Sequence, residues 1–452
     1  MEKIITVIDL GTTKVVCLAG KQTPEGIRIA AAAEAPSQGV QRGEVVNNQK
    51  VLASLAPVLS EMNEKLGTPV SEVIVGIAGR HIRCQATSTT LNRRNRNEEI
   101  TSEEVEQMRC DMFASRVEPG EEVLHVIPQS YHVDENDNMD PVGMYGNSIQ
   151  ASYRLFIGKS LSAEYTKRCI ENAGLKLTQL ILEPLASAAA VLQEDEKELG
   201  VALVDIGGGT TDVLVYHNNI VRHTAVIPFG GNVITEDIRQ GCEVTARQAE
   251  QFKIQYGSAY ADLAPENKTL IIPGIGGREQ REINFRFLAN IIEARVDEII
   301  EAVMYEIRQS GYADRIPGGI VLTGGGALLN NLSAFIKYKT GYDARIARNA
   351  NVTTTESCID DINYLTYSCA IGLMMKGFEP AEAGHPQPEE VLVGSEETVF
   401  TQPAKKAEAP KAEKRSLLKR QEKVKEATKE KVKSPGIFDQ ISNFFFESDN
   451  EA

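Results

Sequence analysis

The sequence lacks the hallmarks of a secreted, disulfide-linked or membrane-spanning protein. Its 7 cysteines are scattered through 452 residues and form neither a CxxC pair nor a secretory pattern. Such a set indicates reduced thiols in a cytosolic protein. The 6 histidines show no metal-ligand spacing. The first residues, Met-Glu-Lys and then a strand pattern, are not expected to form a signal peptide. No apolar run reaches the ~20 residues that span a bilayer.

Basic residues are too few in most of the chain for general nucleic-acid binding. The formal net charge is −15, and residues 1–404 alone carry −18. Between Lys405 and Lys433, however, 12 Lys or Arg oppose 5 Asp or Glu, and residues 434–452 carry 4 acids and no base. An acidic body argues against nucleic-acid partners. The basic segment indicates contact with an acidic surface, either a membrane or a protein.

What the sequence does contain is two glycine-rich turns of the same design. Asp9-Leu10-Gly11-Thr12-Thr13 and Asp205-Ile206-Gly207-Gly208-Gly209-Thr210-Thr211 each lie between two apolar runs. Each motif predicts a β-hairpin whose turn has few side chains, so that its backbone is accessible. Glycine lets backbone N–H groups approach a phosphate, threonine adds donors, and the preceding aspartate can hold Mg²⁺ through water. Together they predict a duplicated fold that grips a phosphate tail from both sides.

The order of elements repeats around these turns. Apolar spacing predicts three strands, a helix and a fourth strand in each copy, which fits mixed α/β sheets flanked by helices. Pro57 is expected to kink or split the first helix. The predicted strands are 4–8, 15–19, 27–33 and 73–77 in the first copy, and 201–206, 213–216, 220–227 and 319–322 in the second.

Two segments do not fit the repeat. The first, 84–159, opens with a polar run, and then Thr101 and Glu104 form a capping box for a helix through about Phe113. Short strands at 123–127, 130–133 and 150–157 complete a predicted small α/β subdomain. The second segment, 229–298, leads into a helix with a long apolar stripe over 287–307, which is most simply core.

Three further motifs each allow a functional and a structural interpretation. Glu183 opens a proline- and alanine-rich helix, so it either reaches water or Mg²⁺ or merely caps a core helix. Leu322–Leu329 predicts a strand and a glycine turn that opens a helix, where free N–H groups lie at a positive end, or an ordinary tight connection. Glu250 and Lys253 share a helix face, where a surface ion pair is the simpler interpretation.

In this order the elements of residues 1–377 resemble the actin, heat-shock-chaperone and sugar-kinase ATPase superfamily. The segments 37–46, 125–128, 140–144, 229–235 and 249–253, and the place of the 84–159 insertion, resemble the bacterial cell-division FtsA family within it. The resemblance implies an α/β fold of actin-like, duplicated ribonuclease-H-like halves around an ATP cleft. An inserted small α/β subdomain and a disordered C-terminal linker that ends in an amphipathic helix complete the implied architecture.

The implied domain boundaries follow the two halves and their insertions. The first half is 1–83 with 160–196 and 362–380, and it carries the inserted subdomain 84–159. The second half is 197–228 with 299–361, and it carries the insertion 229–298. A linker, 381–433, is poor in Leu, Ile, Val and Phe, which indicates disorder. An amphipathic helix, 434–448, follows.

The resemblance also implies an ATP and Mg²⁺ site between the halves. Asp9, Asp205 and Glu183 would hold Mg²⁺, mostly through water. Asp205 and Glu183 are the only catalytic candidates, and slow hydrolysis or ATP binding as an assembly switch both remain open. Expected nucleotide contacts are Gly11, Thr12, Thr13, Lys14, Gly207, Gly208, Gly209, Thr210, Thr211, Gly231, Asn232, Glu250, Lys253, Gly324, Gly325, Gly326 and Ala327.

The C-terminal residues predict an interfacial membrane helix. Ser434 and Pro435 suit a helix start, and one face then gathers the apolar side chains Ile437, Phe438, Ile441, Phe444 and Phe445. Three phenylalanines with no covering core favour a membrane surface over a helix docked on its own body or in a partner's groove. The polar face is acidic, so the lysines in 419–433 would supply the attraction to anionic lipid.

The function implied by the resemblance is that of a cell-division adaptor. Such a protein polymerises at the inner face of the cytoplasmic membrane, anchors the tubulin-like FtsZ ring and recruits later division proteins through its 84–159 subdomain. It would be peripheral and located at the division septum. An actin-fold small-molecule kinase and a pilus-assembly ATPase-like adaptor are the alternatives.

Overall fold

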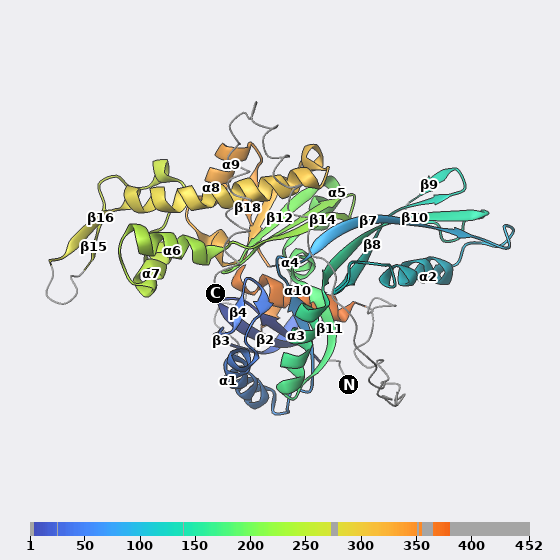
Figure 1. The fold of residues 1–452 in the computed structure, drawn as a ribbon, viewed down its shortest axis with the longest axis horizontal. Coiled ribbons are helices and arrows are strands. Elements are labelled where there is room, and N and C mark those ends of the chain that lie inside the picture. Colours follow the sequence, from blue (N-terminus) through green and yellow to red (C-terminus); the bar gives the residue numbers. More distant parts are fainter. Residues whose placement is uncertain are drawn as a thin grey trace, which may run out of the picture. The chain divides into compact units, whose positions relative to one another are not determined.

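A computed structural model describes residues 4–24, 26–138, 140–272, 279–349, 352–354 and 365–379. These residues belong to one compact unit. The predicted linker 381–433 and helix 434–448 lie outside the described residues. Three sheets carry most of the described strands, and helices pack on their faces (Figure 1).

The first sheet has the strand order β11-β6-β1-β2-β3-β19. Its strands β1, β2 and β3 form two antiparallel hairpins, while β6 and β11 run parallel to β1. Buried aliphatic residues alternate or run continuously along each strand, as expected for a sheet covered on both faces. The strands are β1 (Ile4–Leu10), β2 (Lys14–Thr23), β3 (Gly26–Pro36), β6 (Glu72–Ile77), β11 (Lys176–Leu182) and β19 (Val352–Thr354).

Helices α1 (Asn48–Leu66) and α3 (Ser160–Asn172) cover one face of this sheet. Of the kink or split expected at Pro57, the split is wrong, because α1 is one helix of 19 residues that contains Pro57. Pro57 lies on the exposed face, so the backbone carbonyl it leaves unbonded can reach water. The opposite, buried face is held by apolar side chains that include Val51, Leu55 and Met62.

The second sheet repeats the first, and its order is β14-β13-β12-β17-β18. In each sheet the three hairpin strands lie side by side in the order third, second, first along the chain. Two later strands, which run parallel to the first hairpin strand, follow on its other side. The predicted duplication is therefore confirmed. The strands are β12 (Val201–Ile206), β13 (Thr211–His217), β14 (Ile220–Ile227), β17 (Ile320–Thr323) and β18 (Ala344–Ile346).

Two short helices, α4 (Glu183–Val191) and α10 (Ser368–Phe378), cross tightly beside both sheets. A Cβ on Gly372 of α10 would overlap the backbone of Ala186 in α4. Only glycine therefore allows this approach. The buried side chains of α4 and α10 join one continuous core with both sheets.

The inserted subdomain has its own sheet, with the order β7-β10-β8-β9, and a separate core under α2. The capping box of Thr101 and Glu104 is present and starts α2 as predicted. The two strands predicted at 123–127 and 130–133 are one strand, β8, in which Gln129 forms a bulge against β10. The elements are β7 (Arg83–Asn92), α2 (Ser102–Phe113), β8 (Glu121–Val133), β9 (Asn136–Asn138) and β10 (Ser148–Lys159).

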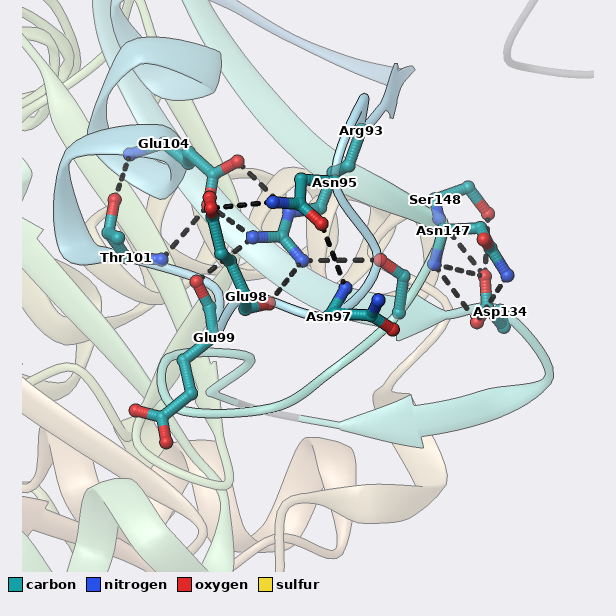
Figure 2. Close-up of polar contacts among 11 residues, drawn as sticks. Arg93, Asn95, Asn97, Glu98, Glu99, Thr101, Glu104, Asp134, Asn147 and Ser148 are labelled. Atoms are coloured by element: carbon teal, nitrogen blue, oxygen red, sulfur yellow. Dashed lines mark hydrogen bonds and ion pairs between the residues drawn. The ribbon is translucent and has the colours of Figure 1, made fainter.

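The polar run that opens this subdomain is ordered by Arg93, as Figure 2 shows. The Arg93 side chain is 4% exposed and pairs with Glu104 at 2.9 Å. Its guanidinium also donates to the carbonyls of Glu98 and Glu99, each at 2.9 Å. A buried charge is tolerated when paired and hydrogen-bonded. One arginine thus ties the loop to the first turn of α2.

The second insertion contains α6 (Gly231–Gly241), α7 (Ala246–Tyr256), the hairpin β15 (Thr269–Ile272) and β16 (Arg281–Asn284), and the start of α8 (Phe285–Gln309). The apolar stripe of α8 faces the core, as predicted, through residues that include Leu288, Val296 and Val303. The shorter elements are β4 (Val40–Gln41), β5 (Glu44–Val45), α5 (Glu194–Leu199) and α9 (Leu332–Thr340). Among the described helices, none is long and apolar enough to cross a membrane.

Candidate functional site

The two glycine-rich turns lie face to face. The first joins β1 to β2, and the second joins β12 to β13. A Cβ on Gly208 would overlap the Thr13 hydroxyl, and a Cβ on Gly209 would lie 2.8 Å from Thr12 Cγ2. Their contact shows that residues almost two hundred positions apart form one site, as the sequence predicts.

The second turn is fixed by backbone hydrogen bonds. The Gly207 N–H donates to the Thr210 carbonyl at 2.9 Å. The carbonyls of Gly207 and Gly208 accept from the N–H groups of Gly231 and Asn232, both at 2.8 Å. The first N–H groups of α6 are therefore used to hold the turn. A phosphate contact from Asn232 would have to come from its side chain.

Four carboxylates gather behind the turns. Asp9 lies near the end of β1, and Glu183 is the first residue of α4. Asp205 and Asp212 lie directly opposite each other on β12 and β13. The Ser187 hydroxyl donates to Asp205 Oδ2 at 2.7 Å. Asp212 is 6% exposed, and its Oδ1 has no hydrogen-bond partner among the described residues.

These carboxylates disfavour one another's ionised forms. Burial and the charge of Asp205 raise the pKa of Asp9 to about 6. Burial, together with Asp9, Asp212 and Asp205, raises the pKa of Glu183 well above its usual range. Burial is also the main cause that raises the pKa of Asp205 and of Asp212. A cation between them would relieve both effects.

The residues fit a Mg²⁺ site of the kind that a phosphate ligand completes. Mg²⁺ takes carboxylate oxygens and waters in most protein sites. The unpartnered oxygen of buried Asp212 supports such a ligand. Asp9, Asp205 and Glu183, the residues predicted from the sequence, lie together in this cluster. The sequence did not single out Asp212, although it lies seven residues after Asp205 on the paired strand.

The predicted adenosine turn lies next to the same acids. Gly324, with φ 78°, follows β17, and its backbone packs against Asp205 and Ile206. The turn opens a 3-10 helix over Gly325–Leu328, and α9 starts only at Leu332. The predicted glycine turn that opens a helix is present, and the helix it opens is of the tighter 3-10 form.

Three predicted contact residues have strong protein partners. Lys253 Nζ lies 2.8 Å from Glu250 Oε2 and donates to the Gly231 carbonyl at 2.9 Å, so this pair ties α7 to the start of α6. Lys14 Nζ donates to Glu34 Oε2 at 2.8 Å and lies 3.5 Å from the centre of the Tyr367 ring. Direct nucleotide contacts from these lysines remain predictions.

Comparisons with known proteins agree with this geometry. A family model described as cell division protein FtsA matches residues 202–372, and one described as the SHS2 domain inserted in FtsA matches residues 79–157. The FtsA of Pseudomonas aeruginosa is 35% identical over 84% of this chain and 91% of its own length. This chain belongs to the FtsA family.

Other FtsA proteins are similarly close. The FtsA of Escherichia coli K12 is 34% identical over 87% of this chain and 94% of its own, and that of Bacillus subtilis is 36% identical over 75% and 77%. The chain is thus a cell-division protein with an actin-like fold, and the predicted family is confirmed.

Solved structures show the same fold at low sequence identity. A PilM–PilN type IV pilus biogenesis complex matches with a TM-score of 0.58 and 15% identity over 84% of this chain and 99% of that chain. MreB5 of Spiroplasma citri bound to ADP matches with a TM-score of 0.52 and 16% identity, over 83% and 96%. These matches support the actin-like fold of this FtsA-family chain.

Proposed function

We propose that this FtsA-family chain binds ATP with Mg²⁺ between its two facing turns and uses the bound nucleotide as an assembly switch. The observation that carries the proposal is the contact of the two turns above a cluster of four carboxylates. Backbone N–H groups at the turns would hold phosphates, and Mg²⁺ would neutralise phosphate and carboxylate charge together. The solved MreB5 structure bound to ADP has the same fold, which supports nucleotide as the ligand.

The chain's own residues suggest positioning more than fast chemistry. Asp9, Asp205 and Glu183 would orient the waters of the cation, and Ser187 fixes one oxygen of Asp205. If the chain hydrolyses ATP, Asp205 and Glu183 are the residues to which the proposal gives a catalytic role. Nucleotide held by both turns would favour closure of the two halves of the chain. The closed form would present the surfaces used in polymerisation.

The cell-division role proposed here is that of a membrane adaptor. The chain would polymerise at the inner face of the cytoplasmic membrane at the septum, anchor FtsZ and recruit later division proteins through the inserted subdomain. Residues 434–448 would attach it to lipid through one apolar helical face. FtsA relatives at 34–36% identity support this role over that of a small-molecule kinase or a pilus adaptor.

Nucleotide binding is tested with a fluorescent ATP analogue and Mg²⁺. Asp205→Asn is expected to weaken binding by about 10–100-fold, because a charge-assisted contact contributes about 1.5–3 kcal/mol. Asp262→Asn is the matched control, since Asp262 lies in the second insertion and pairs with Arg286 at 2.7 Å. Equal affinity of the two variants would reject the site.

Membrane attachment is tested by sedimentation with liposomes and with FtsZ polymers. The full chain should pellet with lipid and carry FtsZ with it, whereas Phe444→Glu with Phe445→Glu should stay in solution. Ser442→Glu, on the predicted polar face, is the control. If the wild-type chain also stays in solution, the lipid role is wrong and a protein groove becomes the better partner for the tail.

A further inference from the structure

The sheet of the inserted subdomain has one face that α2 does not cover. Tyr153 on β10 belongs to the core under α2, so its neighbours Ser152 and Arg154 point to the opposite face. On that face Ser152 lies in register with Ser88 on β7 and Ser130 on β8. β14 of the second half packs against β7 and β8 (Figure 1). The uncovered face is therefore polar where it meets the second half.

A cavity of about 870 Å³ lies between this face and the second half. The subdomain lines it with residues that include Ser88, Ser130 and Arg154, and the second half lines it with Arg222 and Tyr312. Ligand pockets in proteins span roughly 300–1,000 Å³. The cavity is thus large enough for a small molecule, and its lining offers hydroxyl and guanidinium donors.

Arg222 is a buried cation without an anionic partner in the described part of the chain. It is 8% exposed. Its Nη1 donates to Gln129 Oε1 at 3.1 Å, and its Nε donates to the His217 carbonyl at 3.2 Å. Its guanidinium carbon lies 5.3 Å from the centre of the Tyr312 ring. All these partners are neutral groups, whereas a buried arginine is normally paired with an anion.

Two further arginines add charge beside Arg222. Burial and the positive charges of Arg154 and Arg315 lower the pKa of Arg222. Within the described ranges, neither Arg154 nor Arg315 forms an ion pair. Asp137, an acid on the cavity lining, pairs with His132, and its side chain is 85% exposed. The charges of the three arginines are therefore uncompensated.

The charge and the donors of this cavity favour phosphate. Guanidinium groups bind phosphate oxygens through paired N–H donors, and serine hydroxyls can donate to the remaining oxygens. A phosphate ester carries about −1.5 to −2 charge at pH 7, which compensates more of the arginine charge than one carboxylate does. We propose that the cavity binds a small phosphorylated molecule through its phosphate groups, held between Arg154 of the inserted subdomain and Arg222 of the second half.

Such a ligand would tie the inserted subdomain to the second half, because each contributes one of the arginines that hold it. None of the residues involved belongs to the two facing turns or to the carboxylate cluster. The proposal therefore does not rest on the proposed ATP function.

Isothermal titration calorimetry of the full-length chain with inorganic pyrophosphate tests the site, in EDTA and at constant ionic strength. Without Mg²⁺, the four carboxylates of the nucleotide cleft repel this probe. The wild-type chain should bind pyrophosphate, and Arg154→Gln should bind it about 10–100-fold more weakly, as expected for loss of a charge-assisted contact. Arg154→Lys keeps the charge without the planar fork, so its affinity should lie between the two. Arg168, an exposed arginine of α3 that pairs with Glu164, gives the control Arg168→Gln, which should bind as wild type.

Absence of pyrophosphate binding by the wild-type chain overturns the proposal. So does equal affinity of wild type and Arg154→Gln, since the basic segment 405–433 would then hold the probe. Malonate, a dicarboxylate, should bind at least about tenfold more weakly than pyrophosphate because it offers fewer charges and oxygens, and equal affinity rejects a phosphate ligand. Should Arg154→Gln fail to fold, Arg315→Glu reverses the other charge beside Arg222 and should weaken pyrophosphate binding about tenfold; unchanged affinity again rejects the site.

Discussion

The two glycine-rich turns have the same backbone design but opposite side-chain roles. The first turn has one glycine and presents Thr12 and Thr13. The second has three glycines in a row, and the threonines of the first pack against two of them. Duplication has thus preserved the hairpin while one copy came to supply hydroxyl groups and the other the space for them. Two identical turns could not approach each other this closely.

The connecting helices show the same division of roles. α4 starts with Glu183 and α10 carries Cys369 in its first turn, so both begin at the carboxylate cluster. Where the two helices cross, Gly372 of α10 packs against the backbone of Ala186 in α4. One helix thus supplies atoms, and the other supplies the space that receives them.

The largest effect is expected where the helices cross. Gly372→Ala should lower the free energy of unfolding by about 3 kcal/mol, because the new methyl group overlaps backbone that must shift. Helix propensity alone would raise stability by about 1 kcal/mol, so the sign distinguishes the two effects. Gly325→Ala is the control, since its nearest neighbour would lie at 3.6 Å. Denaturant unfolding measures both, and a stabilised Gly372→Ala would contradict the close crossing.

A somewhat smaller effect is expected at the turns. Gly208→Ala should weaken binding of the ATP analogue by about 10–30-fold, equivalent to about 1.4–2 kcal/mol of overpacking against Thr13. Gly207→Ala should weaken binding less than Gly208→Ala, because its Cβ would lie 3.3 Å from the Thr210 carbonyl oxygen, a tight contact that a shift of a few tenths of an ångström relieves. In a Thr13→Ala background the cost of Gly208→Ala should fall. An unchanged cost in that background would show that the turns do not pack on each other when nucleotide is bound.

The outer hairpin strands, β3 and β14, differ in their neighbours. β3 pairs with β19, whereas His223 on β14 lies 3.0 Å from Glu306 on α8. Burial of the His223 ring disfavours its positive charge, but hydrogen bonds with Cys84 and Glu306 outweigh this and raise the pKa of His223 to about 9. The charged form therefore adds stability that is complete below pH 6.5 and lost as the pH rises through 9.

A pH-dependent effect follows from this pair. Between pH 6.5 and 9.5, the wild-type chain should lose up to about 3 kcal/mol of stability that His223→Gln does not lose, because each pKa unit corresponds to about 1.4 kcal/mol. Thermal unfolding at a series of pH values measures the difference. His132→Gln, in the inserted subdomain, controls for general histidine titration. Parallel pH profiles for wild type and His223→Gln would show that the pair adds nothing.

Much of the fold was predictable because the repeated strands are apolar and end in glycine turns. The apolar periodicity and the turn residues predicted β12 and β14 to the residue, and the ends of β1, β2, β3 and β13 to within four residues. β7 was missed because most of its residues are polar and none is buried, so no hydrophobic pattern marks it as a strand. The split predicted at Pro57 failed because the structure places that residue on the exposed face of a helix held by its buried face.

The site was predictable in its acids and turns but not in its hydrogen bonds. Asp9, Asp205 and Glu183 follow from motif and order, and the structure brings them together. The use of the Gly231 and Asn232 N–H groups by the second turn depends on the exact position of α6, which sequence spacing does not fix. The approach of Cys369 to Asp9 was not predicted, because it depends on how α10 crosses α4.

The edge of the first sheet has a consequence for biosynthesis. β3 receives its parallel neighbour β19 from residues 352–354, and α10 packs on β1, β2 and β6 from still later in the chain. At 5–20 residues per second, roughly 15–60 s separate the synthesis of β3 from that of β19. The first half therefore leaves the ribosome with an open strand edge and an uncovered face. The second half completes its sheet within a shorter stretch, so it can fold first, and its partner closes only as the chain nears release.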